Sequence, residues 1–432
     1  MSPVRVAFAL NGSRGDVQPG LAVATALTER GHEVAVGVPQ NLVDFATEHG
    51  VAATVFAPDT ADLLASPLVQ RDLKSRNPRT RSRALREVTE FGATAMDDRF
   101  LEISEGADLV VTGLMGQERA ATIAEYRGAR YVPLHYCPIR PSRSVPVPLG
   151  PLAHLAAVPR LSVAVWRGVE LAYWHLSAKS SDAALRQRLG MSPASGPLAD
   201  RLADAGTPEI QAYEPGLFPR LADEWGAHRP MTGFLTTASD DARPGVDDAA
   251  TDAWLDAGPP PVYVGFGSMP LTDAAAVVGA VVAALRDRGQ RVLVGAGPNL
   301  EALTRSEASD AASADEQVRV VGSTDHASVL PRCAAAVHHG GAGTTGASLR
   351  AGLPTLVAAF SADQPMWGRA IVDSGLGATC PVSRLTDPSV LSSALSTILD
   401  GDVANRCSQF AGAMIDPATA AHTAVETMES AL

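Results

Sequence analysis

Cysteine is scarce in this chain of 432 residues. The four cysteines, Cys137, Cys333, Cys380 and Cys407, are far apart, and no two of them form a CxxC pair. This spacing excludes a disulfide scaffold and a zinc ribbon, because both need clustered cysteines. Four reduced thiols are the simpler interpretation.

Long apolar segments are also absent. The longest apolar run, residues 274–285, has 12 residues, whereas a membrane-spanning helix needs about 20. The start of the chain does not resemble a signal peptide, because the short stretch 4–10 contains Arg5 and leads directly into a glycine-rich turn. We therefore expect a cytoplasmic protein without stable membrane insertion, and leave peripheral membrane contact open.

Positive charge is in deficit. The chain has 35 Lys and Arg residues against 47 Asp and Glu residues, which gives a net charge of −12. Nonspecific nucleic-acid binding depends on neutralising phosphates, so this composition argues against a nucleic-acid partner. The hydrophobic content of 46% excludes a disordered chain, and the length predicts two or three domains.

Short apolar strands alternate with helical stretches along both halves of the chain. The pattern predicts strands at residues 4–10, 32–38, 107–112 and 129–134, and again at 261–266, 291–295, 318–321, 334–338 and 355–360. Strands separated by helices indicate βαβ units and parallel sheets. We therefore predict an α/β protein with two Rossmann-like domains.

The boundary between the two domains is predicted from composition. Residues 236–253 are small, acidic and rich in turn-forming residues, which is typical of a linker. The predicted domains are residues 1–235 and 254–415, and residues 416–432 are predicted to form a helix that packs back on the first domain. Two such domains place a cleft between the carboxyl ends of their sheets, where ligands bind in open α/β folds.

A glycine-rich segment between a buried strand and a helix is the sharpest motif. His338-His339 is followed by glycines that let backbone approach a ligand, and the helix start offers N–H groups suited to phosphate. Gly341, Gly343 and Gly346 also match the GxGxxG dinucleotide fingerprint, with Asp363 at 20 residues past Gly343. An NAD(P)-dependent oxidoreductase is therefore an alternative. The preceding histidines and the late position of the motif favour stabilisation of a leaving diphosphate.

Three further segments carry candidate site residues. Gly267 and Ser268 follow the predicted strand 261–266 and could hold phosphate oxygens, or form a plain tight turn. Asp363-Gln364 offers acceptors and donors for sugar hydroxyls, or a helix cap. Asp16, in the turn after strand 4–10, has the carboxylate that a general base needs, or is an N-cap.

Two inserts have other patterns. Residues 71–86 contain seven positive charges, which indicate either a solvated loop entering a helix or a flap facing an acidic acceptor or an anionic surface. Residues 161–174 have a stripe of apolar side chains at near-helical spacing, with Trp166 and Trp174 alongside. That stripe is either core or the lining of an apolar acceptor pocket.

Together the four motif segments, with residues 365–368, resemble the bacterial, inverting, nucleotide-sugar-dependent glycosyltransferases of GT-B fold. This family includes macrolide, glycopeptide and sterol glycosyltransferases. The resemblance implies that Asp16 is the catalytic base, that residues 1–235 bind the acceptor, and that residues 254–415 bind the donor. It implies a second catalytic residue, His339, and a diphosphate site made of Gly12, Ser13, Gly267, Ser268, His339, Gly341, Gly343 and Thr344. It implies sugar contacts from Asp363 and Gln364, and a nucleobase region at Val321 and Thr324.

The function implied by the resemblance is transfer of a hexose, with inversion, from a UDP- or dTDP-sugar to a hydroxyl of an apolar or amphipathic small molecule. Trp367 is similar to the glucose-using sterol members, whereas Ala358-Ala359-Phe360 stands where relatives often have a proline. No cofactor or metal is expected, because the one Asp-x-Asp triplet, at residues 400–402, is late in the chain and indicates a turn. A nucleotide-sugar epimerase, a glycoside hydrolase and a non-catalytic nucleotide-sugar-binding protein remain alternatives.

Overall fold

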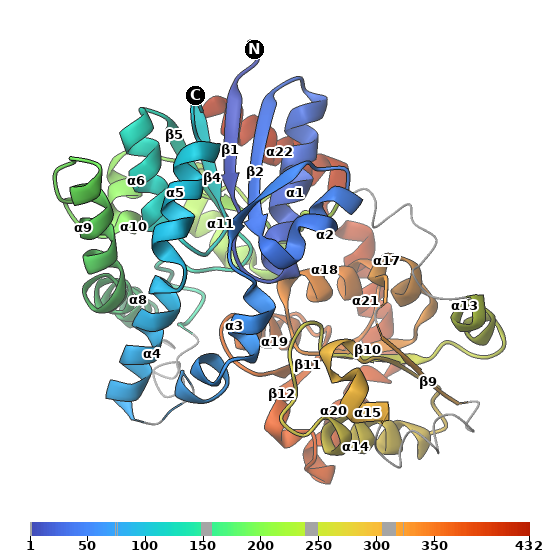
Figure 1. Ribbon diagram of the computed structural model, residues 1–432. Helices are drawn as coiled ribbons and strands as arrows, with labels where there is room; N and C mark the ends of the chain where they lie inside the picture. Colours follow the sequence, from blue (N-terminus) through green and yellow to red (C-terminus); the bar gives the residue numbers. More distant parts are fainter. Residues whose placement is uncertain are drawn as a thin grey trace. The chain divides into compact units, whose positions relative to one another are not determined.

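The computed structural model describes residues 2–73, 75, 77–147, 158–237, 249–304, 317–322 and 324–432. The chain forms two compact units, which Figure 1 shows. The N-terminal unit consists of Met1–Thr237 and Ile415–Leu432, and the C-terminal unit consists of Ala238–Met414. The predicted linker, residues 236–253, spans the point where the chain passes from one unit to the other, and its last residues, 249–253, belong to a helix.

Six parallel strands form the sheet of the N-terminal unit, in the order β3-β2-β1-β4-β5-β6. The strands are β1 (Arg5–Ala9), β2 (Glu33–Pro39), β3 (Ala53–Ala57), β4 (Leu109–Thr112), β5 (Arg130–His135) and β6 (Ile210–Gln211). Val6 of β1 stands in register with Val34 on one side and Leu109 on the other. The central strands are buried, as their nearly continuous apolar sequences require.

Helices cover both faces of this sheet. They are α1 (Arg14–Glu29), α2 (Val43–Glu48), α3 (Thr60–Ala65), α4 (Pro78–Glu90), α5 (Ala93–Ile103), α6 (Gln117–Arg127), α8 (Pro159–Tyr173), α9 (Lys179–Arg188), α10 (Leu198–Asp204), α11 (Pro219–Trp225) and α22 (Pro417–Ser430). Short helical turns are η1 (Gln40–Leu42), η2 (Leu68–Asp72), η3 (Trp174–Ala178), η4 (Pro215–Leu217) and η5 (Gly226–His228). In the described part of the chain, no helix combines the length and apolarity that crossing a membrane requires.

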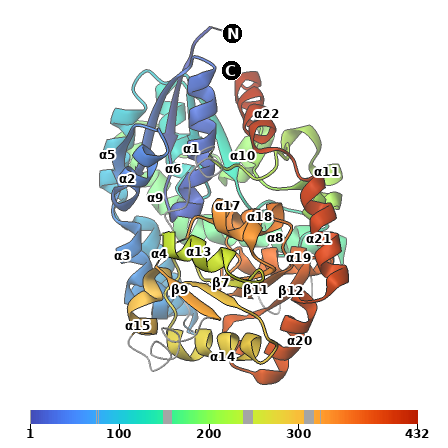
Figure 2. The ribbon, with the colours of Figure 1, turned by 90° about the vertical axis from the view of Figure 1, so that its right-hand side faces the viewer.

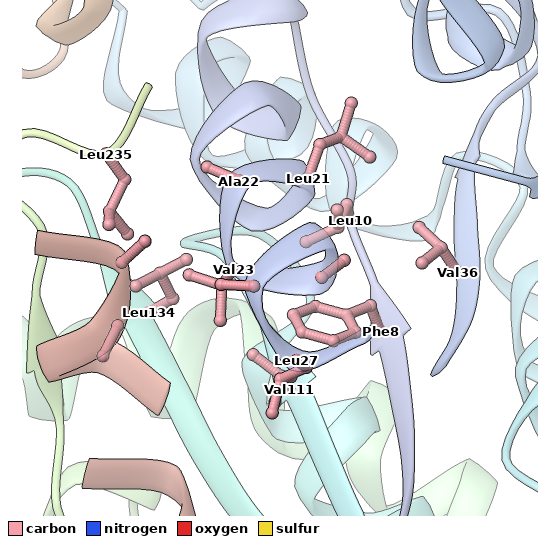
Figure 3. Close-up of a cluster of buried hydrophobic side chains, with 14 of the residues drawn as sticks. Phe8, Leu10, Leu21, Ala22, Val23, Leu27, Val36, Val111, Leu134 and Leu235 are labelled. Carbon is pink, nitrogen blue, oxygen red and sulfur yellow. The ribbon is translucent and has the colours of Figure 1, made fainter. Parts of the chain in front are cut away.

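The core of the N-terminal unit has one layer on each face of the sheet. Figure 3 shows the first, where Phe8 of β1 and Leu10, which follows the strand, lie among the apolar side chains of α1, including Leu21 and Leu27. The second layer packs α5, α6, α9 and α10 against the other face, with Phe100 at its centre. Both layers leave the strand ends free to carry loops with polar side chains.

The last helix of the chain, α22, completes the first of these layers. Ala424, Val425 and Met428 are fully buried in the same cluster as α1. At its rim, Arg30 forms an ion pair with Glu429 at 2.7 Å. Figure 2 shows α22 and α1 at the same end of the N-terminal unit. The end of the chain is therefore a structural part of the N-terminal unit.

The C-terminal unit repeats the same topology. Its parallel sheet has the order β12-β11-β10-β7-β8-β9. The strands are β7 (Val262–Gly265), β8 (Val292–Gly295), β9 (Val318–Val321), β10 (Ala335–His338), β11 (Thr355–Ala359) and β12 (Gly377–Pro381). The helices are α13 (Ala249–Asp256), α14 (Ala274–Arg286), α15 (Leu300–Thr304), α17 (His326–Val329), α18 (Ala342–Arg350), α19 (Gln364–Asp373), α20 (Pro388–Ile398) and α21 (Gly401–Ala413), with turns η6 (Gly297–Asn299), η7 (Leu330–Arg332) and η8 (Val382–Arg384).

Two core layers again enclose the sheet. Helices α14 and α20 cover one face, with Val281, Leu285 and Leu395 fully buried. The other face packs Tyr263 and Leu293 against α13 and the segment α17–η7. The predicted α/β class with two Rossmann-like parallel sheets is therefore confirmed.

All nine strands expected from the sequence lie on observed strands, but three strands were not expected. Strand β3 is at an edge and has two exposed residues, so it lacks a continuous apolar pattern. Strand β6 has only two residues. Strand β12, at the other sheet's edge, begins with Gly377 and ends with Pro381, both of which are unusual inside strands.

The two inserts form helices. Helix α4 takes up most of the basic segment, whose Lys74 and Arg76 lie outside the described residues. In the second insert, Trp166 and Trp174 are buried, which confirms the core interpretation for the tryptophans. The two ends of the apolar stripe, Leu161 and Tyr173, are exposed, so the stripe as a whole is not core.

We predict that Met428→Ala destabilises the N-terminal unit. The Met428 side chain is fully buried against the α1 layer, and truncating such a side chain typically costs about 2–5 kcal/mol. Calorimetric unfolding is expected to show a lower midpoint for one transition. The matched control is His422→Ala, because His422 is exposed on the same helix, and an equal loss in both variants would contradict the prediction.

Candidate active site

Both sheets reverse their strand order once, and the motifs lie at these points. In the N-terminal unit the reversal falls between β1 and β4, and in the C-terminal unit between β7 and β10. Connections leave adjacent strands there in opposite directions, so the loops after the strands part and leave room for a ligand. The segment around Asp16 follows β1, and the segments around Gly267 and His339 follow β7 and β10.

Asp16 lies in the first turn of α1 and is tied to the residue that precedes the helix. Its Oδ2 accepts hydrogen bonds from the backbone N–H of Ser13 at 2.6 Å and from the Ser13 hydroxyl at 2.7 Å. Gly12 has a φ of +122°, and a Cβ there would stand 2.4 Å from Asp16 Oδ2. The N-cap residue of α1 is Ser13 and Asp16 is the third helix residue, so the N-cap alternative for Asp16 is wrong. The carboxylate still supports the helix start by accepting the Ser13 hydrogen bonds, and its place depends on glycine at position 12.

Tyr136, which the sequence analysis did not single out, also acts on Asp16. The Tyr136 side chain follows β5, is buried, and influences the pKa of the Asp16 carboxyl. Its hydroxyl also accepts the backbone N–H of Leu114 at 3.1 Å, in the loop after β4. Because β1, β4 and β5 are neighbouring parallel strands, their carboxyl ends bring these residues to one edge of the sheet.

Burial sets the electrostatics of Asp16. It raises the pKa of the carboxyl above its usual value, and the hydrogen bonds from Ser13, with a smaller effect of the Tyr136 hydroxyl, partly offset this rise. A raised carboxyl pKa makes the ionised form a stronger base. The arrangement can therefore accept a proton from a bound hydroxyl.

A small, largely apolar pocket lies beside the end of β1. Its lining includes Asn11, Phe56, Met96, Phe100 and Met115. Met115 is 43% exposed, in the loop after β4. Methionine side chains adapt to irregular apolar groups, but the pocket as it stands has room for little more than one water molecule, and its lining also includes Asp97 and Arg119.

In the C-terminal unit, the His339 ring lies between two glycines. A Cβ at Gly267 would be 2.8 Å from His339 Cε1, and a Cβ at Gly341 would be 2.5 Å from His339 Nε2. Gly297, which the sequence analysis missed, allows a third close approach, because its Cβ would be 2.6 Å from the Gly267 carbonyl oxygen. The structure thus brings Gly267, His339 and Gly341 together, although they come from two different strands.

The two adjacent histidines have different environments. His338 is fully buried, and its Nδ1 accepts the backbone N–H of Gly340 at 2.9 Å, so this ring braces the loop. His338 therefore has a structural role. Burial, with a smaller contribution from the charge of His326, lowers the pKa of His339 to about 4. His339 is neutral at pH 7, and an anion bound beside it would favour its protonated form.

Helix α18 presents an open amino end next to this ring. Gly341 precedes the helix, and no side chain caps it. Gly343 is exposed, and a Cβ there would meet no atom within 4 Å. Thr344 is half-buried in the first turn, while Ser268 is exposed in the turn after β7. Uncapped N–H groups with the positive end of the helix dipole suit phosphate oxygens.

Asp363 and Gln364 are held by hydrogen bonds at the start of α19. Asp363 Oδ2 accepts the indole N–H of Trp367 at 2.9 Å, and the Asp363 side chain does not cap the helix. Gln364 Oε1 accepts the backbone N–H of Phe360 at 2.7 Å, which leaves its amide nitrogen to donate elsewhere. Ala362, just before them, has a φ of 57°, a left-handed conformation that is uncommon for alanine.

The predicted nucleobase region contains a hydrogen-bonded group of side chains. The Tyr263 hydroxyl lies 3.1 Å from Thr324 Oγ1 and 3.0 Å from His326 Nε2. Gly295 makes room for it, since a Cβ there would be 2.6 Å from the Tyr263 hydroxyl. Val321 is the last residue of β9 and lies at the same sheet edge. Tyr263 and His326 were not expected, because the sequence does not show that β7 and β9 end near each other.

The Asp-x-Asp triplet has a structural role. Oδ1 of Asp400 accepts the backbone N–H groups of Asp402 and Val403, at 2.9 and 3.1 Å, and starts α21. The ranges that the structure covers hold no group of three His, Cys, Asp or Glu side chains placed to bind a metal ion. The triplet is therefore a helix cap.

Comparisons with known proteins agree with this arrangement. Residues 6–101 match the glycosyltransferase family 28 N-terminal domain, and residues 300–427 match the C-terminal domain of erythromycin biosynthesis protein CIII-like proteins. The chain is 36% identical over 423 residues to an uncharacterized glycosyltransferase of Mycobacterium tuberculosis, covering 97% of each chain. It is also 30% identical over 427 residues to a sterol 3-beta-glucosyltransferase of Arabidopsis thaliana, covering 94% of this chain and 65% of that enzyme.

Solved structures share the fold. The calicheamicin glycosyltransferase CalG4 has a TM-score of 0.70 at 16% identity, covering 100% of this chain and 99% of that one. The glycosyltransferase SnogD from Streptomyces nogalater has a TM-score of 0.62 at 19% identity, covering 99% of this chain and 100% of that one. The two sheets are those of the GT-B fold. The chain belongs to the glycosyltransferase family that includes the macrolide, glycopeptide and sterol enzymes, as the resemblance implied.

We predict that two glycine substitutions between His339 and the first turn of α18 have opposite effects on stability. Gly341→Ala would press a methyl group against the His339 ring, and overpacking of this kind costs about 1–3 kcal/mol. Gly343→Ala, in the helix and in open space, is expected to stabilise the protein by about 0.5–1 kcal/mol. Chemical denaturation of both variants measures the difference. Equal free energies of unfolding would contradict the packing of His339 described above.

Proposed function

We propose that this glycosyltransferase moves a hexose, with inversion and without a metal ion, from a UDP- or dTDP-sugar to a hydroxyl of an apolar or amphipathic small molecule. The observation that carries the proposal is the pair of contrasting groups at the two switch points. One is a neutral imidazole beside an open helix end, suited to an anion. The other is the Asp16 carboxyl, whose pKa is raised by burial.

The donor side is argued from charge. A departing nucleoside diphosphate gains negative charge, and preorganised donors stabilise such charge by about 2.7–4 kcal/mol each in other enzymes. The backbone N–H groups at the start of α18, the hydroxyls of Ser268 and Thr344, and the His339 ring are the donors that we assign to the diphosphate. We assign Gly12 and Ser13 to its neighbourhood on the acceptor side.

The donor sugar and the nucleobase are assigned to side chains on either side of the diphosphate site. Asp363, fixed by Trp367, and the amide nitrogen of Gln364 offer an acceptor and a donor for vicinal sugar hydroxyls. Val321 and Thr324 are assigned to the nucleobase. The choice between uracil and thymine nucleotides stays open in this proposal, because related structures titled as complexes hold thymidine diphosphate and dTDP, whereas the sterol relatives are named glucosyltransferases.

The acceptor side is argued from Asp16 and its pocket. In our proposal, Asp16 removes the proton of the acceptor hydroxyl while the oxygen attacks the anomeric carbon. The C–O bond to the diphosphate breaks on the opposite face, and the diphosphate leaves with the bonding electrons. The apolar side chains of Phe56, Met96 and Met115 lie beside the end of β1, and an apolar or amphipathic acceptor would have to displace them, because the pocket itself holds little more than one water molecule.

A nucleotide panel tests the donor assignment. Thermal-shift measurements with UDP, dTDP, UDP-glucose, a dTDP-sugar and NAD(H) are expected to show stabilisation by uracil or thymine diphosphates and not by NAD(H). Gly343→Ala is expected to weaken this binding at least tenfold, because its methyl group would occupy space that is open for phosphate. The same variant is expected to be more stable than the natural protein without nucleotide, so weaker binding could not be ascribed to unfolding.

The opposite result in the panel is informative. Stabilisation by NAD(H) alone would overturn the proposal in favour of dinucleotide binding. Wild-type nucleotide affinity in Gly343→Ala would show that phosphate does not approach the start of α18.

We further predict that Asp16→Asn abolishes most transfer. A positioned general base contributes typically ~10²–10⁴-fold, so kcat for transfer to a phenolic or sterol test acceptor is expected to fall by about that factor. Nucleotide affinity is expected to remain within about twofold, because Asn can still accept the Ser13 hydrogen bonds. Steady-state kinetics with a UDP- or dTDP-sugar measures both quantities.

A matched control is Asp108→Asn. Asp108 Oδ2 also accepts a backbone N–H, that of Arg5 at 2.8 Å, but it lies just before β4, at the amino end of the sheet. Replacing this carboxylate is expected to leave kcat within about twofold of the value for the natural protein. Full transfer activity in Asp16→Asn would remove Asp16 from the role of base.

A further inference from the structure

A second hollow lies in the N-terminal unit, between α8, α10, α11 and the loop after β5. Its volume is about 750 Å³, within the range of about 300–1,000 Å³ that is typical of small-molecule sites. It shares no lining residue with the pocket at the end of β1, and no residue that we assign to the reaction lines it. The hollow is therefore a candidate ligand site that is separate from the proposed reaction site.

Hydrogen bonds fix two walls of this hollow. Trp225 Nε1, on α11, donates to the carbonyl oxygen of Pro141 at 3.1 Å. Oε1 of Glu224, on the same helix, accepts the backbone N–H of Arg143 at 2.7 Å. Both bonds join α11 to the loop after β5, so these walls keep their positions without a ligand. A ligand that binds there does not have to order them, which favours affinity.

Glu170, on α8, brings an unsatisfied hydrogen-bond acceptor to the hollow. Its Oε1 is buried and has no hydrogen-bond partner among the residues that the structure describes. Burial raises the pKa of the Glu170 carboxyl to about 7, while the charges of Arg140, Asp200, Glu209 and Arg229 act on it with opposing signs. A carboxyl with this pKa is ionised in about half of the molecules at pH 7, so it can accept a hydrogen bond from a ligand or donate one.

Four arginine side chains also line the hollow, and three of them have no acidic partner in the described part of the chain. Arg229 pairs with Glu209 at 2.8 Å. Arg143, Arg167 and Arg220 are exposed, and no ion pair joins them to another described residue. A guanidinium group presents a planar fork of donors that matches the oxygens of phosphate and carboxylate. These walls are therefore suited to an anionic group.

The combination of charges restricts the class of ligand. An apolar molecule would remove water from these charged groups without pairing them. A small inorganic anion would leave Glu170 Oε1 unpaired, and a simple cation would leave the guanidinium groups without a partner. Asp200 and Asp223 add two carboxylates to the lining, which suit several hydroxyl donors better than a single ammonium group. A carbohydrate that carries a phosphate group meets all of these requirements.

We propose that this hollow is a binding site for a phosphorylated carbohydrate, with a hydroxyl group paired to Glu170 and the phosphate held by guanidinium groups. The guanidinium groups are those of Arg143, Arg167 and Arg220. The ligand binds reversibly, and no bond in it is broken. The inference goes beyond the proposed function, because it uses neither Asp16 nor the start of α18.

Calorimetric titration of the full chain tests the inference. The probes are glucose 6-phosphate and maltose 1-phosphate, and at least one is expected to bind with a Kd below about 1 mM. Glucose, inorganic phosphate and glutamate are expected to bind at least tenfold more weakly, because none of them combines hydroxyl groups with a phosphate. Each titration is repeated with saturating UDP, which is expected to leave the affinity for the probes unchanged.

Two variants locate the binding. Arg167→Ala and Glu170→Leu are each expected to weaken probe binding at least tenfold, because each removes a partner of the ligand. Glu170→Leu also removes the unpaired buried oxygen, so the thermal midpoint of this variant is not expected to fall. The matched control is Arg160→Ala, because Arg160 is exposed on the same helix and does not line the hollow. This control is expected to leave the affinity unchanged.

Several results would overturn the inference. They are the absence of binding by both probes, an affinity for inorganic phosphate or glutamate equal to that for the probes, and an unchanged affinity in both variants. Loss of probe binding when UDP is added would also overturn it, because the probes would then occupy the proposed diphosphate site. A protein that binds the probes but not UDP would count against the proposed function alone.

Discussion

The structure depends on one constraint: parallel strands all end at the same edge of their sheet. In each unit the strand order reverses once, between β1 and β4 and between β7 and β10, and loops leaving adjacent strands separate there. Residues far apart in the chain are therefore neighbours. His339, after β10, meets Gly267, after β7, and the Leu114 N–H, after β4, donates to the Tyr136 hydroxyl, after β5. Every polar group that we assign to the reaction follows a strand or starts the next helix.

Burial has opposite effects on the two central groups. Desolvation disfavours the charged form of any side chain, so it raises the pKa of the Asp16 carboxyl and lowers the pKa of the His339 ring. For each group the neutral form gains stability in the protein. In the function that we propose, a ligand anion beside His339 favours the charged imidazolium, and an acceptor hydroxyl beside Asp16 supplies the proton that the carboxylate lacks. The same low-polarity surroundings thus prepare one unit for an anion and the other for a proton.

Sequence patterns predicted the helices and strands better than they predicted the contacts between residues. Strands with continuous apolar residues, such as β1 and β10, could be located because both of their faces are buried. Edge strands β3 and β12 could not, since an edge strand needs no such pattern. Among candidate site residues, Asp16 and His339 stand in glycine-rich turns that mark them. Tyr136 directly follows strand β5, in a segment without a glycine-rich motif. Its influence on Asp16 depends on the order of the strands in the sheet, which local sequence does not encode. A rule that inspects the first residue after each strand would have found it.

The loop around His339 carries a cost that its packing does not remove. Among the described residues, the buried polar atoms without hydrogen-bond partners include His338 Nε2, His339 Nδ1, Thr345 Oγ1 and Ser348 Oγ. Each such atom costs about 1–3 kcal/mol wherever neither water nor a ligand pairs with it, and the left-handed Ala362 adds strain nearby. An apolar replacement of His339 would avoid part of this cost, so stability alone does not account for a histidine there. The role that we propose for His339, stabilising a departing diphosphate, accounts for it, because that role needs a donor held ready in a water-poor position.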